Sequence, residues 1–476
     1  MVHVHIRAWT GGLRIRPTPT PRRSSRWHER GGNPLNGPDQ TVQIGETTCG
    51  ASKRTGINCT IGVNALRSVF NIYVLLRLVN TGLGMLWGFI LMAVMIKIVG
   101  LTQYANYVLI GAIGLYIASA DLGISNILYA QLRNAHLSGS ISSMISPARG
   151  AIIVYISTSI ASVCFYAAYL FGFSMHGADS TCALFLFFFA TLANVPWIVI
   201  RSAAAAVDRH LEFEIVDFIR RSGQIICLVL LYQIRNPVVV FFLLNITWVA
   251  AYFLAFKNLT AGGLSNFSLD PKDLIADFRS FLQKFGSMII HSAIFVLSDA
   301  FIYHFPYAVI PMAWGVGPEI VLFDVFYKFA RAAIAFNQIF SSGLLPQLTR
   351  NHFLGKKAEV THTLFYIGGL SLFGMISMNI ILHVKADLIF RALLHDKAYL
   401  VGGPLLASIA IVSLANAFQN TAGSYIVNIG QVRLAKLLGV VMAGLFAVLA
   451  AIVVIVHLSF DVFLLIYSLL YATGAL

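Results

Sequence analysis

Long stretches without charge constrain this chain more than any other feature of its sequence. Twelve apolar stretches follow one another, each near the length of about 20 residues that crosses a lipid bilayer. They lie at 78–98, 106–130, 150–173, 182–207, 216–234, 237–256, 284–305, 318–345, 362–384, 401–427, 436–457 and 460–476. Because 58% of the 476 residues are apolar and only 11% are charged, a set of soluble domains is excluded. We therefore predict an all-α, polytopic membrane protein with about twelve transmembrane helices.

The positions of Lys and Arg test this count, because short cytoplasmic loops accumulate basic residues. Connections after the even-numbered stretches hold fifteen basic residues, and those after the odd-numbered stretches hold four. The fifteen include Arg201, Arg209, Arg220 and Arg221. The bias predicts that both termini are cytoplasmic. It also favours separate crossings at 216–234 and 237–256, because one fused crossing would place the basic stretch 257–284 outside.

The first 64 residues form a separate basic segment. They hold nine basic and three acidic residues, which give a net charge of +6 out of the formal +14 of the chain. The segment is rich in Pro and Gly and has no apolar run, so it cannot offset the entropy of ordering, and we predict a disordered tail. No apolar stretch follows Met1, so no cleaved signal peptide is expected. The other charges lie in loops and spans and leave no basic face for nucleic acid.

Short fingerprints that recur about 217 residues apart predict two parallel halves. Residues 131–137 follow the second stretch, and the similar residues 347–354 follow the eighth. Six spans per half is an even number, so both halves face the same way, as in transporters with a central cleft. We predict a tail at 1–64, a six-helix bundle at 65–256, a cytoplasmic linker at 257–284 and a second six-helix bundle at 285–476.

Ionisable residues inside the spans are few, and each costs about 2.5–3.5 kcal/mol on insertion scales, so they normally face a cavity or a partner. Asp324, Lys328 and Arg331 in the eighth span share one helical face by their spacing. Asp324 and Lys328 fit an internal salt bridge as well as they fit a ligand site. Arg77 and Arg201, near span ends, fit either headgroup contact or ligand contact. Such a cationic lining suits a phosphate-bearing substrate.

Asp121 and Asp299 lack basic neighbours in sequence, which favours a role in a cavity or in ion coupling. Gly84 and Gly88 form a small-xxx-small pair, which predicts close packing of helices. Pro196 is expected to bend its helix. The Cys and His residues have no metal-ligand spacing, and no HExxH, GxSxG or Walker sequence occurs. We therefore expect no catalytic residues, no bound metal and no cofactor.

Two stretches carry a resemblance to a known family. Residues 97–104 (Lys-Ile-Val-Gly-Leu-Thr-Gln-Tyr) and 120–126 (Ala-Asp-Leu-Gly-Ile-Ser-Asn) resemble the opening of bacterial polysaccharide (O-antigen type) flippases. These belong to the multidrug, oligosaccharidyl-lipid and polysaccharide exporter superfamily. The second half is similar at Ser298-Asp299, Lys328, Pro346 and residues 428–431. The resemblance covers residue 66 to the end, and departs from the usual pattern at Ala105 and at Phe323-Asp324.

The resemblance implies two six-helix bundles around a central cavity that opens alternately to the two sides of a bacterial cytoplasmic membrane. The implied substrate is an undecaprenyl-pyrophosphate-linked oligosaccharide for O-antigen, capsule or exopolysaccharide synthesis. Besides membrane lipid, a polysaccharide polymerase and glycosyltransferases are the implied partners. The candidates for phosphate or sugar binding are Arg331, Lys328, Arg77 and Arg201. The candidates for proton or sodium coupling are Asp299, Asp121 and Asp324.

Three rival functions predict different features. A purely structural or assembly protein would have all of its intramembrane charges paired. An ion-coupled exporter of organic cations with the same fold would have an acidic, aromatic cavity instead of a cationic one. A membrane polymerase or glycosyltransferase would need a large external loop or a catalytic acidic cluster at a membrane face, and neither is visible in the sequence.

Overall fold

The computed structural model of the protein describes residues 58–119, 124–138, 142–172, 178–259, 271–428 and 432–474. The chain divides into two units, Met1–Ile61 and Gly62–Leu476. Most of the predicted tail lies outside the described residues. Helix α1 (Asn58–Val99) begins before the predicted end of the tail at residue 64, so the last part of that segment is helical.

Helices α1 to α8 form what we call the N-terminal half, and helices α9 to α16 form the C-terminal half. The first set continues with α2 (Leu101–Ser119), α3 (Ile124–Leu137), α4 (Ser142–Gly172), α5 (Ala178–Leu192), α6 (Asn194–Ala206), α7 (His210–Ile234) and α8 (Pro237–Leu259). The second set is α9 (Pro271–His304), α10 (Pro306–Trp314), α11 (Pro318–Phe353), α12 (Lys357–Val384), α13 (Ala386–Leu394), α14 (Gly403–Asn428), α15 (Val432–Val456) and α16 (Phe460–Thr473). A 3-10 helix, His395–Leu400, follows α13. Each predicted span is therefore matched by a helix or by a pair of helices.

The fourth predicted span is broken into α5 and α6, and Pro196 explains where. Proline has no backbone N–H, and its ring displaces the carbonyl four residues earlier, which here belongs to Leu192. Helix α5 ends at that residue. The exposed carbonyl of Ala193 in the break accepts a hydrogen bond from the Tyr252 hydroxyl of α8. Helix α6 packs against α3 and α4 as well as against α7 and α8.

The predicted separate crossings at 216–234 and 237–256 are confirmed as α7 and α8. Arg235 adopts a left-handed conformation with a φ of 56° and ends α7. The Asn236 side chain then caps α8 by accepting a hydrogen bond from the Val238 N–H at 3.0 Å. Pro237 stands at the first helical position, where its missing N–H costs nothing.

The predicted linker 257–284 is largely helical. Helix α8 runs to Leu259 and α9 begins at Pro271, so only residues 260–270, which lie outside the described residues, separate the two. The hydrophilic sequence after Pro271 is therefore the first part of a long helix and not a loop, and its polar side chains are accommodated because several of them remain exposed.

This first part of α9 packs against α4 of the N-terminal half. Arg149 of α4 lies 3.4 Å from the carboxylates of both Asp273 and Asp277. Gly150 allows the close approach, since a Cβ atom there would lie only 2.7 Å from Cβ of Phe281. Helix α9 then continues to contacts with α15, so it touches both halves.

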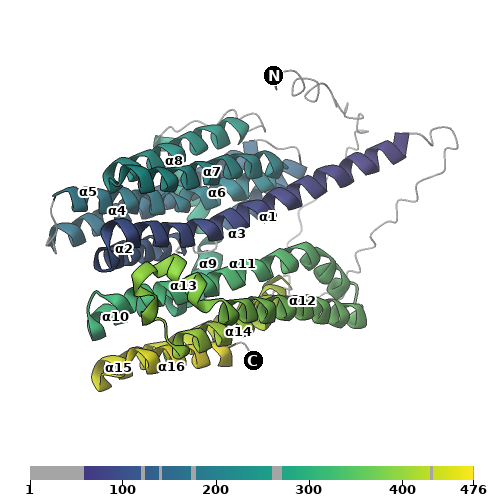
Figure 1. Ribbon diagram of the computed structural model, residues 1–476. Helices are drawn as coiled ribbons and strands as arrows, with labels where there is room; N and C mark the ends of the chain where they lie inside the picture. Colours follow the sequence, from purple (N-terminus) through teal and green to yellow (C-terminus); the bar gives the residue numbers. More distant parts are fainter. Residues whose placement is uncertain are drawn as a thin grey trace, which may run out of the picture. The chain divides into compact units, whose positions relative to one another are not determined.

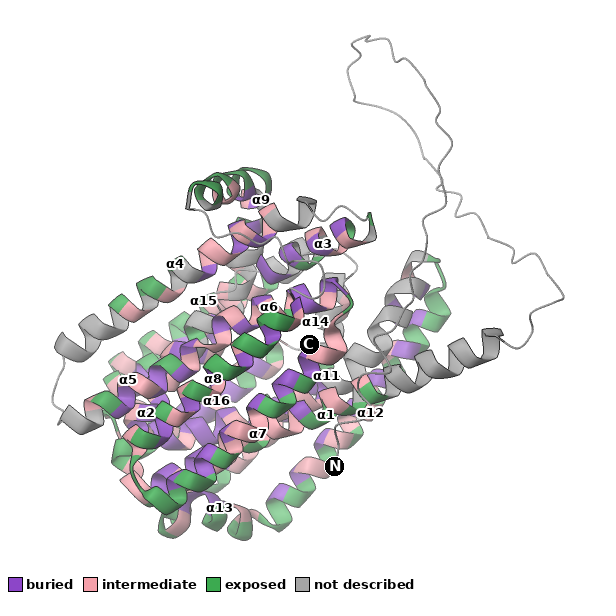
Figure 2. Cartoon of the chain, turned by 90° about the horizontal axis from the view of Figure 1, so that it is seen from above, coloured by how far each residue is buried: buried purple, intermediate pink, exposed green. Residues whose placement is uncertain are grey.

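Exposed apolar side chains show which surfaces suit lipid. Within the part of the chain that the structure describes, five helical segments are long and apolar enough to cross a membrane, namely Leu75–Val99, Thr181–Ala206, Pro237–Leu259, Lys357–Val384 and Leu437–Val456. Phe253 on α8 and Phe365 on α12 are 71% and 78% exposed, a large cost in water but none in hydrocarbon. Exposed residues recur along the outward faces of both helices (Figure 2).

Contacts between connections agree with the predicted alternation of sides. Arg133, near the end of the second span, forms an ion pair of 2.6 Å with Asp208, which follows the fourth. Lys97, at the end of the first span, donates a hydrogen bond of 2.8 Å to Tyr232 at the end of the fifth. Ends of even-numbered spans thus meet one another, as do ends of odd-numbered spans.

The two halves (Figure 1) meet where α4 packs against α9, and also through α2, which packs against α11 and α9. The Phe89 ring of α1 also contacts the Phe329 ring of α11 at an interplanar angle of 55°, with ring centroids 4.9 Å apart. His395 Nε2 lies 2.9 Å from the backbone carbonyl of Ala93 in α1. These contacts place α1, α2 and α11 around a common space.

Candidate substrate-binding cavity

A cavity of about 540 Å³ is lined by side chains from both halves. Its walls come from α1, α2 and α5 to α8 in the N-terminal half, and from α10 and α11 in the C-terminal half. Among the described residues, five cationic side chains line it, from Arg201, Arg220, Arg221, Lys328 and Arg331. Aromatic side chains line it too, from Trp87, Tyr104, Tyr107, Phe187, Phe241, Trp248, Tyr307 and Tyr327. An aromatic cavity with a few converging charges is typical of a ligand site.

In the C-terminal half, Asp324, Lys328 and Arg331 all line the cavity, which confirms that they share one face of α11. The carboxylate of Asp324 accepts hydrogen bonds from Lys328 Nζ and, at 2.8 Å, from the Tyr104 hydroxyl of α2. Lys328 Nζ also donates to that hydroxyl at 3.2 Å. The Asp324–Lys328 ion pair is therefore part of the cavity wall, and Tyr104 ties it to the N-terminal half. Arg331 is more exposed than either of them.

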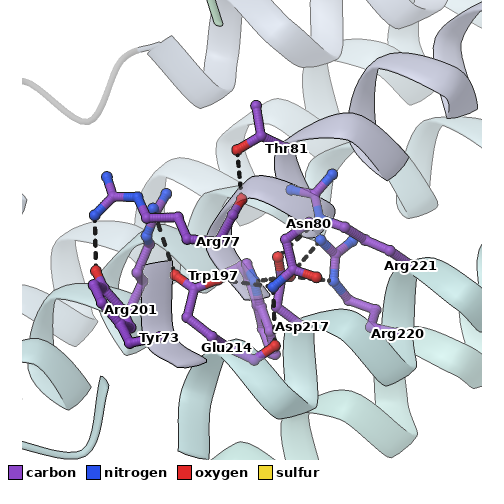
Figure 3. Close-up of polar contacts among 10 residues, drawn as sticks. All are labelled: Tyr73, Arg77, Asn80, Thr81, Trp197, Arg201, Glu214, Asp217, Arg220 and Arg221. Carbon is purple, nitrogen blue, oxygen red and sulfur yellow. Dashed lines mark hydrogen bonds and ion pairs between the residues drawn. The ribbon is translucent and has the colours of Figure 1, made fainter. Parts of the chain in front are cut away.

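In the N-terminal half, one carboxylate serves two arginines (Figure 3). Asp217 Oδ1 accepts hydrogen bonds from Arg220 Nε at 2.9 Å and from Arg220 Nη2 at 2.6 Å. Asp217 Oδ2 accepts one from Arg221 Nε at 2.8 Å. The indole N–H of Trp197 in α6 donates to Oδ1 at 2.9 Å. The carboxylate thus has partners on both oxygens and holds two cations beside the cavity.

The two arginines differ in how far they are open to the cavity. The side chain of Arg220 is 3% exposed and that of Arg221 is 28% exposed. The Arg220 guanidinium lies 4.1 Å from the centre of the Trp248 ring and 5.3 Å from that of Trp197, which adds cation–π attraction. Arg220 is therefore held in the wall, whereas Arg221 reaches into the cavity.

A third polar group joins α1, α6 and α7. Arg201 Nη2 lies 3.8 Å from Glu214 Oε1, and the Arg201 side chain is half exposed. Asn80 of α1 donates to Glu214 Oε2 at 2.7 Å (Figure 3). Arg77 donates to the Tyr73 hydroxyl at 2.8 Å, within its own helix. Arg201 lines the cavity, while Arg77 is not among the described residues that line it.

Sequence and structure comparisons give different results for this chain. No protein-family model matches it, and no curated protein matches it by sequence. A solved structure described as an inward-facing multidrug resistance MATE family transporter of the MOP superfamily matches with a TM-score of 0.63 and 11% identity. The match covers 84% of this chain and 95% of that one. The chain has the fold of the MATE transporters.

Other solved structures with the MATE fold agree. An outward-facing MATE family transporter has a TM-score of 0.57 and 12% identity, over 85% of this chain and 93% of that one. A eukaryotic MATE transporter has a TM-score of 0.56 and 8% identity, over 85% and 94% of the two chains. The predicted all-α fold with twelve transmembrane helices in two bundles is confirmed. The predicted resemblance agrees with these matches at the level of the fold.

Within this MATE fold, the structure brings four of the predicted site residues together. Lys328, Arg331, Arg201 and Asp324 line one cavity. Arg77 lies on α1 and contacts Tyr73 instead. Asp121 lies outside the described residues, and so does the side chain of Asp299, although its backbone belongs to α9.

Arg220 and Arg221 are the cavity residues that the sequence prediction missed. The sequence analysis assigns both to a cytoplasmic connection. The structure places both inside α7, more than two turns from its start. The signal that could have found them is Asp217, which stands three and four residues before them, at the spacing of a helical ion pair. Spacings of three and four residues bring side chains together on a helix but not in an extended loop.

Replacing Tyr104 with Phe should weaken the tie between α2 and α11. A hydrogen bond to a charged group contributes about 1.5–3 kcal/mol, so the variant should melt at a lower temperature than the wild type in detergent. In a double-mutant cycle with Asp324→Ala, the two losses should not add, because both remove the same bond. The matched control is Tyr107→Phe on the same helix, whose hydroxyl forms no hydrogen bond among the described residues. Fully additive losses would show that Tyr104 and Asp324 act independently.

Proposed function

We propose that this protein is a transporter that moves a polyprenyl-pyrophosphate-linked oligosaccharide across a bacterial cytoplasmic membrane by alternating access. The movement would run from the cytoplasmic to the outer leaflet, in O-antigen, capsule or exopolysaccharide synthesis. Glycosyltransferases would build the lipid-linked oligosaccharide before this movement, and a polysaccharide polymerase would act on it afterwards. Both termini of the transporter would be cytoplasmic. The observation that carries the proposal is the cationic character of the cavity.

Charges in the cavity favour an anion over a cation. Among the described residues that line it, Asp324 is the one acidic residue, against five cationic ones. Two further carboxylates, Glu214 and Asp217, contact these cations from behind. Without Arg331, the described lining residues and their direct partners still hold four cationic groups and three carboxylates. A pyrophosphate group would add charge of the sign that such a cavity attracts.

The shape and walls of the cavity support a sugar-bearing substrate. Its aromatic side chains present flat apolar faces with polar edges, which suit sugar rings that are apolar on one face and polar around the rim. The headgroup needs a polar route across about 30 Å of hydrocarbon, whereas a polyprenyl tail can remain in the lipid.

The nearest rival is export of organic cations, since solved structures with this fold are described as multidrug resistance transporters. That function favours a net acidic cavity, because a positive ligand gains from carboxylates and loses from guanidinium groups. The excess of Arg and Lys among the described lining residues weighs against it, whereas the aromatic lining fits it as well as it fits sugars. For coupling to protons or sodium, Asp324 is the candidate with described contacts, and it is already paired with Lys328; Asp121 and Asp299 complete the proposed set.

Depletion of the protein in its own cells should make the lipid-linked oligosaccharide accumulate in the cytoplasmic leaflet. The accumulation follows because the headgroup cannot cross the hydrocarbon unaided. To measure it, closed, right-side-out vesicles are treated with a glycosidase that cannot enter them. The lipids are then extracted, and the fraction that kept its sugars is determined. A wild-type copy supplied on a plasmid should restore glycosidase access. If the lipid is equally accessible with and without the protein, the proposed substrate is wrong.

A further inference from the structure

Gly84 of α1 leaves space that is filled by the end of the Arg221 side chain. A Cβ atom at position 84 would lie 2.1 Å from Arg221 Nη1 and 3.1 Å from Arg221 Cζ. No real side chain fits at those distances, so any residue other than Gly would displace the guanidinium. Glycine inside a helix costs about 0.5–1 kcal/mol relative to alanine, and here that cost is matched by a specific gain of space.

Gly88, one helical turn along α1, faces a cation from the other half. A Cβ atom there would lie 3.5 Å from Lys328 Cε of α11, an ordinary van der Waals contact. The sequence predicts that the small-xxx-small pair of Gly84 and Gly88 brings two helix backbones together. The structure shows that it does not. The nearest atoms to both glycines are instead the ends of an arginine and a lysine that line the cavity.

Arg221 is free to present donors to the cavity because Asp217 occupies only part of its guanidinium. Nε donates to Asp217 Oδ2 at 2.8 Å, and Nη1 points toward Gly84. Arg220 uses both Nε and Nη2 on the same carboxylate and is enclosed by tryptophans. Of the two arginines, Arg221 is the one that a ligand can reach.

We infer that Gly84 is a positioning residue, which holds the Arg221 guanidinium in the cavity against α1, one helical turn from Lys328. An anionic group on this face of α1 then meets one cation from each half. The anion binds most strongly when Arg221 of α7 and Lys328 of α11 are both close to it. Its binding therefore favours the arrangement in which α7 and α11 lie on the same side of α1. The nature of that anion rests on the proposed function, but the position of the guanidinium does not.

Gly84→Ala tests this position without any ligand. The colliding atom is the far end of a flexible side chain, so the variant should fold with a melting temperature close to that of the wild type while the guanidinium moves away. Gly82→Ala is the matched control, since a Cβ atom there meets nothing within 4 Å on the same helix. Thr81, which lines the cavity one turn before Gly84, is changed to Cys in each background as a reporter.

The readout is the rate at which Cys at position 81 reacts with an anionic and with a cationic methanethiosulfonate, read at that peptide by mass spectrometry. After correction for reactivity with a free thiol, the wild-type background should favour the anionic reagent. The preference should fall severalfold with Gly84→Ala and stay unchanged with Gly82→Ala. The inference is overturned if the wild-type background shows no preference, or if Gly84→Ala leaves it unchanged.

Binding of inorganic pyrophosphate to the purified protein separates this inference from the proposed function. Gly84→Ala and Arg221→Gln should each raise the Kd about tenfold, and the double variant should be no worse than Arg221→Gln alone, since both act on one group. Additive losses would mean that Gly84 acts elsewhere and would overturn the inference. If the wild type binds no pyrophosphate while the labelling preference behaves as expected, the positioning role stands and the proposed substrate fails.

Discussion

Replacing Asp217 with Ala should cost about 3–5 kcal/mol of folding stability, because it leaves buried charge without a counter-ion. Two guanidinium groups depend on this one carboxylate, and the Arg220 side chain is 3% exposed. Tryptophan rings beside Arg220 cannot replace a full negative charge. The variant should therefore melt far below the wild type in detergent, or fail to accumulate in the membrane.

The control for this prediction is an ion pair of the same residue types on the surface. Asp208 lies 2.6 Å from Arg133, but its side chain is 56% exposed, and exposed pairs contribute only about 0–1 kcal/mol. Asp208→Ala should hardly move the melting temperature. A variant that removes Asp217, Arg220 and Arg221 together, with apolar replacements, should recover part of the loss. Equal melting temperatures for Asp217→Ala and Asp208→Ala would contradict the role given to Asp217.

Removing the cations of α11 should abolish transport while leaving the protein folded. The variant carries Lys328→Gln with Asp324→Asn, so that no carboxylate is left unpaired, and adds Arg331→Gln. Each charge-assisted contact with a phosphate contributes about 1.5–3 kcal/mol, so the loss of two should slow transport by about a hundredfold or more. The measurement is the restoration of glycosidase-accessible lipid in cells depleted of the native protein.

Lys356→Gln is the matched control for this second prediction. Its amino group pairs with Glu359 at 3.0 Å on the exposed surface at the start of α12, away from the cavity. It removes one positive charge without touching the lining, so transport should match that of the wild type. If both variants transport equally well and both fold, the α11 cations do not contact the substrate.

Much of the fold follows from sequence because a bilayer allows few solutions. Length and apolarity locate each span, and the distribution of basic residues fixes which ends lie together. The shared face of Asp324, Lys328 and Arg331 follows from helical spacing alone. The break after Leu192 is also readable, since Pro196 removes the support of the carbonyl four residues before it.

The rest of the site depends on contacts between distant helices, which no local pattern contains. Arg220 and Arg221 resemble the basic residues of a cytoplasmic connection until Trp197 and Trp248 are seen to surround Arg220. Gly84 has the spacing of a helix-packing motif, but its neighbour is a side chain from α7. An arginine can lie in a loop or in a cavity wall, and a glycine can face a helix backbone or a side chain. Only the tertiary contacts show which of these applies.

The central claim, that the cavity carries a lipid-linked sugar, is tested most directly in liposomes. Purified protein is reconstituted with a fluorescent polyprenyl-pyrophosphate-linked oligosaccharide, and the fraction of it open to an impermeant quencher is followed over time. We predict that the wild type makes the inner-leaflet lipid accessible, that the triple α11 variant does not, and that a fluorescent organic cation is not carried. Transport of the organic cation, with the lipid left in its leaflet, would contradict the claim.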